Sequence, residues 1–552
     1  MEPCDIYWHS IVYSDLKYIV TNANSRVNKF PGMTELAKKV ALTRAILSMK
    51  MLFDKEYEFY PNSWFIPAQL NDFTYTFYQV AIDKYFTSGA QGTGIYLIQS
   101  PDEIKDRSSR QLIQEYIADP LLMSEHLKFD LRVYAVIKSI NPLSIYVARE
   151  GMVRFCTEKY VKPTRENADN LYAHLTNYSL NKSNQSYVHS YSLADQMHAS
   201  KRLLSSVFYQ LEMNGVNVRL LWHNIKIIIV KTILAMIPEI MLNYEHYFCD
   251  SPGPQCFQIV GFDILIKEDE TPILLEVNSA PSLTVDHIVD EAIKIPLVRD
   301  TILLVLDLLD KDCNTKTLKF FYTIDFQIFP NRYRQNSGHL LFLDKAMYLY
   351  MQFINIKATI TITLSGVRSF VRKCNLLDVI SLSEAEQKFR EIYINFTGEH
   401  EISVTSGTGL PFHAFLQLLY YIAELKFFKH DTLLEKVQDL LIFCDLSLRH
   451  YGIRSARLRR TEIDKSDKEN CVEIYLLPSR LAERRGGNES KRRRTAEQRL
   501  AQRQRYGHSL PRAANISSPN SSRELNQQQS VADVKNKTSL PKLRPPFVFG
   551  LR

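Results

Sequence analysis

The sequence lacks the patterns that would place it in a membrane or outside the cell. No run approaches the roughly 20 uninterrupted apolar residues of a membrane helix. The nearest candidate, Ile225 to Met241, is interrupted by Lys226 and Lys231. The start, M-E-P-C-D-I-Y-W-H, has neither the basic residues nor the apolar core of a signal peptide. The eight cysteines include no C-x-x-C pair, which argues against a zinc site and favours a reducing compartment. We therefore expect a cytoplasmic protein with no membrane partner.

A Walker phosphate loop is also absent, although the sequence contains a glycine loop. The loop is G-A-Q-G-T-G (Gly89 to Gly94), and no G-K-[ST] follows it. The run after it, Ile95 to Gln99, predicts a strand rather than a helix, so the dinucleotide fingerprint is not met either. Glycines let backbone N–H groups approach a phosphate without obstruction. A simple turn is the alternative interpretation.

Charge is distributed unevenly along the 552 residues. The chain is 45% hydrophobic, enough for two or three folded domains, and its net charge is +8. Between Arg480 and Arg505 stand ten basic and three acidic residues. Such a segment suits a polyanionic partner, either an acidic protein tail or nucleic acid. The alternatives are a solvated tail or, at K-R-R-R (Lys491 to Arg494), a nuclear import signal. Few large apolar residues follow Pro478, which predicts disorder there.

Hydrophobic periodicity predicts alternating elements. We expect a strand, the glycine loop and a strand over 75–98, and a helix N-cap at Thr34 in F-P-G-M-T-E. Further strands are expected at 112–117, 131–139, 143–149, 256–266 and 272–277. Helices are expected over most of 197–240 and at 288–309, 412–428 and 432–451, within a region of mixed strand and helix from 313 to 475.

Two of the predicted strands place oxygen-bearing side chains together. Glu276 and Asn278 are two residues apart in P-I-L-L-E-V-N, so they face the same side of a strand. The preceding strand, G-F-D-I-L-I, is joined by a short turn and offers Asp263 across an antiparallel hairpin. Hard oxygen ligands suit Mg²⁺, which usually also binds substrate phosphates. A polar strand end exposed to water is the alternative.

Charged residues alternate in another predicted strand, L-K-F-D-L-R. Period-two spacing puts Lys128, Asp130 and Arg132 on one face. This row is either a solvated edge or one wall of a nucleotide site, with cations facing phosphates. The hairpin partner ends in Arg149, a further cation. The polar loop H-L-T-N-Y-S-L-N-K that follows at 174–182 is either a capped turn or part of the same site.

Taken in order, these stretches resemble the tubulin–tyrosine-ligase-like family of amino-acid ligases, and most of all its polyglutamylases. The resemblance covers roughly residues 8 to 310. The stretches that carry it are N-K-F-P-G-M-T-E-L-A-K-K, Y-P-N-S-W-F-I-P, Q-G-T-G-I-Y-L-I, I-Q-E-Y-I, K-F-D-L-R-V-Y, A-R-E-G-M-V-R-F-C-T-E-K-Y, H-L-T-N-Y-S-L-N, Q-I-V-G-F-D-I-L and L-L-E-V-N-S-A-P-S-L. Each alone is modest, but the ordered series is specific.

The resemblance implies an α+β fold with an ATP-grasp core, a mixed C-terminal extension and a disordered basic tail. It divides the chain into an N-terminal subdomain (1–70), a central ATP-grasp subdomain with the glycine loop (71–117), a C-terminal ATP-grasp subdomain (118–312), the extension (313–477) and the tail (478–552).

The resemblance also implies roles for individual residues. Mg²⁺ would be held by Asp263, Glu276 and Asn278. ATP would contact Lys84, Gln91, Gly92, Gly94, Gln114, Glu115, Tyr116, Ile117, Lys128, Asp130, Thr176 and Asn177, with 114–117 as the hinge against adenine. Arg132 and Arg149 would serve catalysis where the substrate carboxylates and an acyl-phosphate meet.

The implied activity is ATP- and Mg²⁺-dependent addition of free L-glutamate to glutamates of acidic tubulin tails. Tubulin or microtubules would be the partner, the cytoplasm and cytoskeleton the location, with the cilium or basal body as further candidates, and nucleic acid is not expected to bind. One departure stands out. Relatives carry a phosphate-contacting lysine and a proline just before the glycine loop, at the positions of Tyr85 and Phe86, and Lys84 lies one residue off. A catalytically impaired microtubule-binding protein is therefore one alternative. A glycine ligase is another, since the donor is not fixed by these residues.

Overall fold

The computed structural model describes residues 4–9, 25–80, 86–90, 93–140, 142–193, 197–248, 255–306, 324–329, 338–356, 358–397 and 408–449, and two short strands at 459–460 and 474–475. All of these belong to one compact unit, residues 1–486. The tail after 478, predicted to be disordered, lies outside the described residues.

The largest sheet has seven strands, and every pairing in it is antiparallel. Its strands are β7 (Leu127–Ile140), β8 (Leu143–Ala148), β9 (Met152–Lys159), β10 (Lys201–Leu203), β11 (Gln258–Ile266), β12 (Pro272–Asn278) and β13 (Ile324–Phe329). They run in the order β10-β9-β7-β11-β12, while β8 pairs with the second half of β7 and β13 pairs with β8. The predicted hairpins β7–β8 and β11–β12 are both present.

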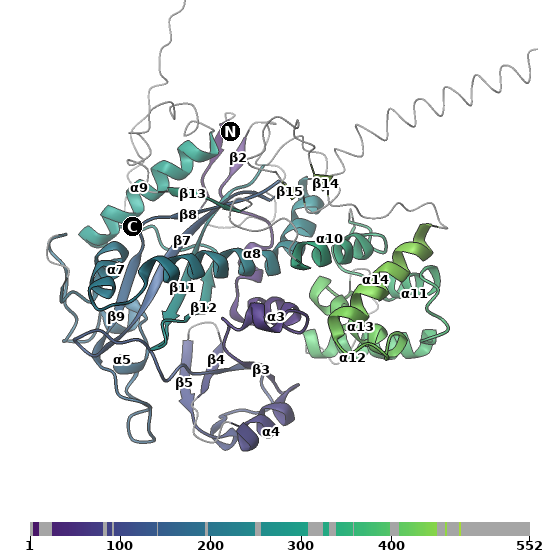
Figure 1. The fold of residues 1–552 in the computed structure, drawn as a ribbon, viewed down its shortest axis with the longest axis horizontal. Helices are drawn as coiled ribbons and strands as arrows, with labels where there is room; N and C mark the ends of the chain where they lie inside the picture. Colours follow the sequence, from purple (N-terminus) through teal and green to yellow (C-terminus); the bar gives the residue numbers. More distant parts are fainter. Residues whose placement is uncertain are drawn as a thin grey trace, which may run out of the picture. The chain divides into compact units, whose positions relative to one another are not determined.

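Helices cover both faces of this sheet. Val133, Ala135 and Ile137 share a buried cluster with α8 (Val218–Phe248), whereas Tyr134 and Val136 pack with α9 (Ile288–Val305). Figure 1 shows α8 lying across the strands of the sheet. Because both faces are covered, residues 133–137 of β7 are apolar on both sides of the strand. Among the described helices, none combines the length and apolar character needed to cross a bilayer.

A second, four-stranded sheet lies earlier in the chain. Its order is β3 (Ser63–Ile66), β6 (Gln111–Glu115), β4 (Phe86–Ala90) and β5 (Thr93–Ile98). The helix α4 (Leu70–Val80) packs on it through Phe73 and Phe77. The prediction of a strand from residue 75 was therefore wrong as far as Val80. Phe73 and Phe77 are four residues apart, so one helical face buries both rings.

The remaining elements of the first 306 residues are short, apart from α3. They are β1 (Ile6–Tyr7), β2 (Arg26–Val27), α2 (Met33–Leu36), α3 (Lys39–Lys50), η1 (Asp54–Tyr57), η2 (Pro101–Glu103), α5 (Leu171–His174), α6 (Tyr178–Asn181) and α7 (Leu204–Met213). The predicted N-cap at Thr34 was wrong, because Gly32 precedes α2 at a φ of 80° and Thr34 lies inside the helix.

The chain after β13 is mainly helical where the structure describes it. Its helices are α10 (Gly338–Met351), α11 (Leu364–Lys373), α12 (Leu382–Thr397), α13 (Phe412–Lys426) and α14 (Leu433–Arg449), here called the helical module. α13 and α14 confirm the two predicted amphipathic helices. The expected alternation of strands and helices was wrong for the described part, where the only strands after 306 are β13, β14 (Arg459–Arg460) and β15 (Ile474–Tyr475).

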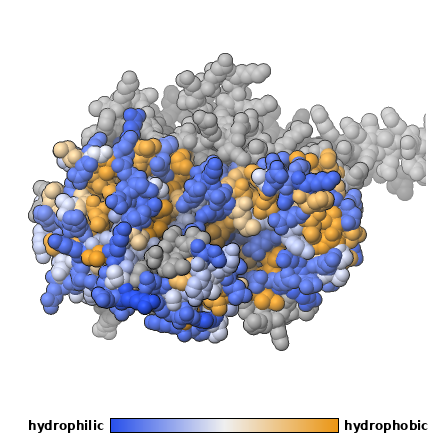
Figure 2. Space-filling view, turned by 60° about the horizontal axis from the view of Figure 1, so that its bottom comes forward, coloured by the Kyte–Doolittle hydropathy of each residue, from blue (hydrophilic) through white to orange (hydrophobic). Residues whose placement is uncertain are grey.

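The surface shows no unusual accumulation of apolar residues on the face drawn in Figure 2. Hydrophilic residues predominate there, and hydrophobic ones are interspersed among them. Scattered apolar side chains of this kind are normal for a folded protein.

Candidate active site

The β11–β12 hairpin brings two carboxylates and an amide together. Asp263 and Glu276 are paired across the ladder. The Nδ2 of Asn278 donates to Oε1 of Glu276 at 3.1 Å and lies 3.5 Å from Oδ2 of Asp263. The side chain of Asp263 is only 2% exposed. The predicted convergence of these three side chains is therefore present in the structure.

The two carboxyl groups differ in their affinity for protons. Burial, followed by the charge of Asp263, raises the pKa of Glu276 to about 7. Burial also opposes ionisation of Asp263, but the guanidiniums of Arg132 and Arg154 outweigh it and hold the pKa of Asp263 well below its usual range. Two adjacent carboxylates, one buried and one half-buried, with the Asn278 amide beside them form a set of side chains that fits Mg²⁺, provided the amide turns its oxygen towards the ion. A divalent cation bound here would favour the ionised form of Glu276. Without such a cation, burial and the charge of Asp263 favour the protonated form.

Two arginines pair with carboxylates across three neighbouring strands, β9, β7 and β11. Arg132 of β7 donates to Asp263 through two N–H groups, with 2.8 Å from Nη2 to Oδ2. Arg154 of β9 donates to Asp263 from Nη2 at 2.7 Å and to Oδ1 of Asp130 from Nε at 3.0 Å. Asp130 is fully buried. Such charges persist in a protein interior only when they are paired.

Arg154 was not selected from the sequence. Register explains its place: β9 pairs with β7 so that Arg154 stands directly opposite Asp130. That register follows from the long-range pairing of the strands, and no local pattern in M-V-R-F-C-T marks it.

A lysine from the N-terminal part of the chain interacts electrostatically with the same carboxylates. Lys39 begins α3, and the preceding Lys38 provides no side-chain cap. Burial lowers the pKa of Lys39, and the negative charges of Glu276 and Asp263 oppose this lowering. A buried hydrogen bond of 2.8 Å between Thr43 Oγ1 and Tyr60 Oη holds α3 in place. Lys39 therefore adds a cation that the sequence analysis did not identify.

The predicted adenine hinge is held by side-chain hydrogen bonds. Gln114 is buried and donates from Nε2 to Ser63 Oγ at 3.0 Å. Glu115 accepts from Asn62 Nδ2 at 2.8 Å. Ile117 follows directly after Tyr116 in the turn beyond β6. These contacts fix the backbone from β6 into that turn.

Lys128 lies beneath this hinge. Its Nζ donates to Tyr116 Oη at 2.8 Å and sits 4.0 Å from the centre of the Tyr116 ring. Tyr116 Oη is in turn 3.1 Å from His174 Nδ1. Burial lowers the pKa of Lys128 to about 8. The ammonium is thus close to the hinge and separated from bulk water, as a phosphate- or base-contacting group would be.

The other predicted residues are placed less closely around the carboxylates. Thr176 is buried, whereas Asn177 is exposed where α6 begins, and Arg149 is exposed directly after β8. Asn181 anchors this loop, since its Oδ1 accepts from the Thr157 hydroxyl at 2.9 Å. Lys84, Gln91 and Gly92 lie outside the described residues, and Gly94 is described only as part of β5.

Family comparisons match two parts of the chain. Residues 19–314 match the tubulin-tyrosine ligase family. Residues 326–465 match a model described as the EF-hand of the tubulin polyglutamylase TTLL11. The first match contains all the residues of the site, and the second contains the helical module.

Several curated proteins are similar over most of the chain. The tubulin polyglutamylase ttll-11 of Caenorhabditis elegans is 58% identical over 532 residues, which cover 89% of this chain and 74% of that protein. The human tubulin polyglutamylase TTLL11 is 35% identical over 504 residues, covering 81% of this chain and 69% of that protein. The zebrafish tubulin polyglutamylase ttll6 is 36% identical over 310 residues, or 55% of this chain and 39% of that protein.

Proposed function

Because the chain belongs to the tubulin-tyrosine ligase family, we propose that it is a tubulin polyglutamylase with an ATP-grasp core. It joins glutamate to glutamate side chains or branches of tubulin tails, with ATP as the energy source, in the cytoplasm on microtubules. The names of its relatives support this activity. The observation that carries the proposal is the convergence of Asp263, Glu276 and Asn278 with Arg132 and Lys39.

The chemistry follows from charge. A carboxylate is a poor electrophile, so the γ-phosphoryl group of ATP is first transferred to an acceptor carboxylate oxygen, and ADP leaves. The amine of free glutamate then attacks the acyl carbon and a C–N bond forms. The C–O bond to phosphate breaks, phosphate leaves with the electron pair, and the amine releases a proton to solvent. Asp263, Glu276 and Asn278 would hold Mg²⁺, which would supply positive charge to offset that of the ATP phosphates.

The protein's own cations have separate tasks in this scheme. Lys128 lies beside the hinge and binds nucleotide. Lys39, whose charge interacts with Glu276 and Asp263, supports the phosphates there. Arg132 and the exposed Arg149 stabilise the oxyanion of the tetrahedral intermediate. Loss of one such group typically lowers a rate by about 10²–10³-fold.

Incorporation of labelled glutamate into microtubules tests the proposal. The purified chain with ATP and Mg²⁺ should label tubulin, and Glu276→Gln should abolish the labelling because a metal-binding carboxylate is lost. Glu268→Gln is the matched control, since Glu268 lies exposed at the turn of the same hairpin. Co-sedimentation with microtubules without incorporation would instead support a catalytically silent binder. Labelled glycine in parallel tests the donor.

A further inference from the structure

Helices α10 to α13 form two helix–loop–helix units joined by a short bridge. Ile362, before α11, and Leu410, before α13, exchange backbone hydrogen bonds of 2.9 Å in each direction. Tyr350 fixes the bridge, because its hydroxyl donates to the carbonyls of both Ile360 and Leu410 at 2.9 Å. This pairing of two loops is the geometry of an EF-hand pair, in which the eighth residues of the two twelve-residue loops form the bridge.

The bridge sets the register of both loops, and the register shows what occupies the metal-ligand positions. Calcium is bound from positions 1, 3, 5, 7, 9 and 12, with a bidentate Glu at 12. Counted along the sequence from the bridge, the first loop has Asn355, Lys357, Thr359, Thr361, Thr363 and Gly366 at these positions. The second has Ser403, Thr405, Gly407, Gly409, Pro411 and Ala414. Of these twelve, Lys357, Ser403, Thr405 and Gly407 lie outside the described residues and are assigned by sequence alone. Neither set contains a carboxylate, so neither loop carries the charge that calcium affinity requires.

The last ligand position of the first loop, Gly366, is also tightly surrounded by neighbouring atoms. A Cβ added at Gly366 would lie 2.7 Å from the carbonyl oxygen of Phe353 and 2.8 Å from Ile362 Cγ1. A glutamate at this position therefore has no space. At Gly409 an added Cβ would meet the Ile362 carbonyl oxygen at 2.5 Å. At these two described positions the chain is therefore packed too closely to admit a larger side chain.

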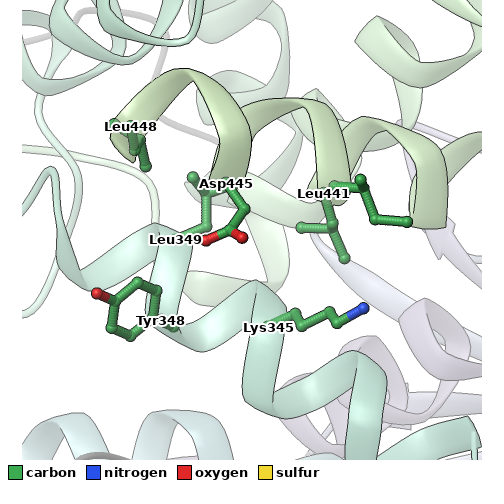
Figure 3. Close-up of a pocket in the computed structure, with 7 residues that line it drawn as sticks. Lys345, Tyr348, Leu349, Leu441, Asp445 and Leu448 are labelled. Atoms are coloured by element: carbon green, nitrogen blue, oxygen red, sulfur yellow. The ribbon is translucent and has the colours of Figure 1, made fainter. Parts of the chain in front are cut away.

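The apolar side of the pair is covered by the chain itself. Leu441 and Leu448 of α14 are buried and belong to the same cluster as Leu349 of α10. Figure 3 shows these side chains between the two helices, with Tyr348 at the edge. Only a hollow of about 50 Å³ remains there. α14 thus occupies the place where a calcium-activated EF-hand protein would bind a target helix.

The module also contacts α3. His413 Nδ1 of α13 is 2.8 Å from Ser48 Oγ, and the Tyr420 hydroxyl donates to the Ser48 carbonyl at 2.9 Å. At the end of α12, Arg44 donates to the Asn395 carbonyl at 3.3 Å and stacks 4.2 Å from the Phe396 ring. His413, Ser48 and Tyr420 are buried. α3 is therefore fixed to the module along its second half, while its first residue is Lys39.

We propose that the helical module is an EF-hand pair that binds no calcium and serves as a fixed support for α3, the helix that begins at Lys39 and packs against β12, the strand of Glu276 and Asn278. The part that concerns Lys39 rests on the proposed nucleotide site. The part that concerns calcium and the position of α3 is independent of it.

Calcium titration of the full chain tests the first half. We expect no saturable heat and the same midpoint of thermal unfolding in calcium and in EGTA. The titration is repeated with Glu276→Gln, because calcium can also bind a carboxylate cluster. Heat that disappears in Glu276→Gln belongs to that cluster and agrees with the proposal. Saturable binding that persists in Glu276→Gln overturns it.

Ser48→Ala tests the second half, with Thr363→Ala as the matched control. Both variants remove one hydroxyl, but the Thr363 hydroxyl caps α11 away from α3. Hydrogen exchange of residues 39–50 should accelerate in Ser48→Ala and not in Thr363→Ala. Affinity for a fluorescent ATP analogue should fall by about fivefold in Ser48→Ala alone, the equivalent of one lost hydrogen bond.

Tyr420→Phe provides a second variant at the same contact and should behave like Ser48→Ala. Equal exchange of α3 in all three variants and the unaltered chain overturns the supporting role. A chain that binds no ATP at all contradicts the proposed function instead, and the exchange of α3 then decides the structural part by itself.

Discussion

Arg154 lies between two buried carboxylates, and its guanidinium donates to both Asp130 and Asp263. Its side chain is only 13% exposed, so little water is available to replace these bonds. The desolvation of such a group is offset only by its partners, and removal of one partner leaves an uncompensated charge in the interior. At the scale of single residues, Arg154 thus affects both the electrostatics of the site and the stability of the sheet.

Arg154→Met should lower the free energy of unfolding by about 3–5 kcal/mol, because it leaves Asp130 buried without this partner. Urea denaturation followed by circular dichroism measures the effect. Adding Asp130→Asn should recover part of the loss, since the unpaired charge is then removed. If the losses in free energy of unfolding caused by Arg154→Met and by Asp130→Asn simply add in the double variant, the pairing is contradicted.

The carboxyl group of Glu239 on α8 should make the free energy of unfolding depend on pH. Burial raises the pKa of this carboxyl to about 7, against the weaker opposing effects of the His413 backbone N–H and Arg44. Its folded-state pKa is above its unfolded value, so its favourable contribution is complete below pH 4.5 and is lost as the pH rises through 7. At pH 8 ionisation should therefore destabilise the fold by about 3 kcal/mol.

Glu239→Gln removes this titration. Thermal or urea unfolding should show the variant more stable than the unaltered chain at pH 8, with the difference shrinking towards pH 5. A difference that is constant across this range would show that Glu239 does not titrate as proposed.

At the scale of elements, the turn between β8 and β9 packs directly on β7. A Cβ added at Gly151 would lie 2.5 Å from the carbonyl oxygen of Arg132. The obstacle is backbone, which cannot move aside as a flexible side chain does. Because Gly151 has no side chain, the β8–β9 turn can pack closely against β7, the strand that carries Arg132.

Gly151→Ala should reduce the glutamylation rate by about tenfold or more, since small displacements of catalytic groups have effects of this size. Gly215→Ala is a suitable control. Gly215 has a φ of 91°, so alanine is strained there, but open space surrounds the position. Both variants should lose stability, and only Gly151→Ala should lose rate. Equal rates in the two variants would contradict the positioning of β7 by this turn.

The elements also show how far the sequence alone can predict this site. The β11–β12 hairpin was predictable because apolar runs flank a short polar turn, and period-two spacing then aligns Asp263, Glu276 and Asn278. Arg154 and Lys39 reach the same carboxylates through contacts between segments far apart in the chain, and no local pattern records such contacts. The EF-hand pair escaped prediction because its loops have lost the carboxylates that identify the motif.

At the scale of the whole molecule, residues 1–486 form one compact unit. Contacts reach the module from several directions. Arg110, beside the second sheet, donates to the Phe396 carbonyl at 3.1 Å, and His246 of α8 lies 2.6 Å from the carbonyl oxygen of Ile356. α8 and the module share one buried cluster. The C-terminal extension is therefore part of the catalytic body.

A chain ending at residue 323 should fail to fold cooperatively, because it exposes the apolar surfaces of α3 and α8 that the module covers. A chain ending at residue 486 should keep the melting temperature of the full chain. Differential scanning calorimetry compares the two. A sharp transition and full nucleotide affinity in the shorter chain would show that the module is dispensable.

The pairing of β13 with β8 has a consequence for biosynthesis. β8 precedes residue 150, whereas its partner strand emerges from the ribosome nearly 180 residues later. At a synthesis rate of about 5–20 residues per second, the nascent sheet waits on the order of ten seconds or more with an unpaired edge. A strand edge of this kind pairs readily with other chains. Translation of this protein thus passes through an interval in which chaperone binding matters most.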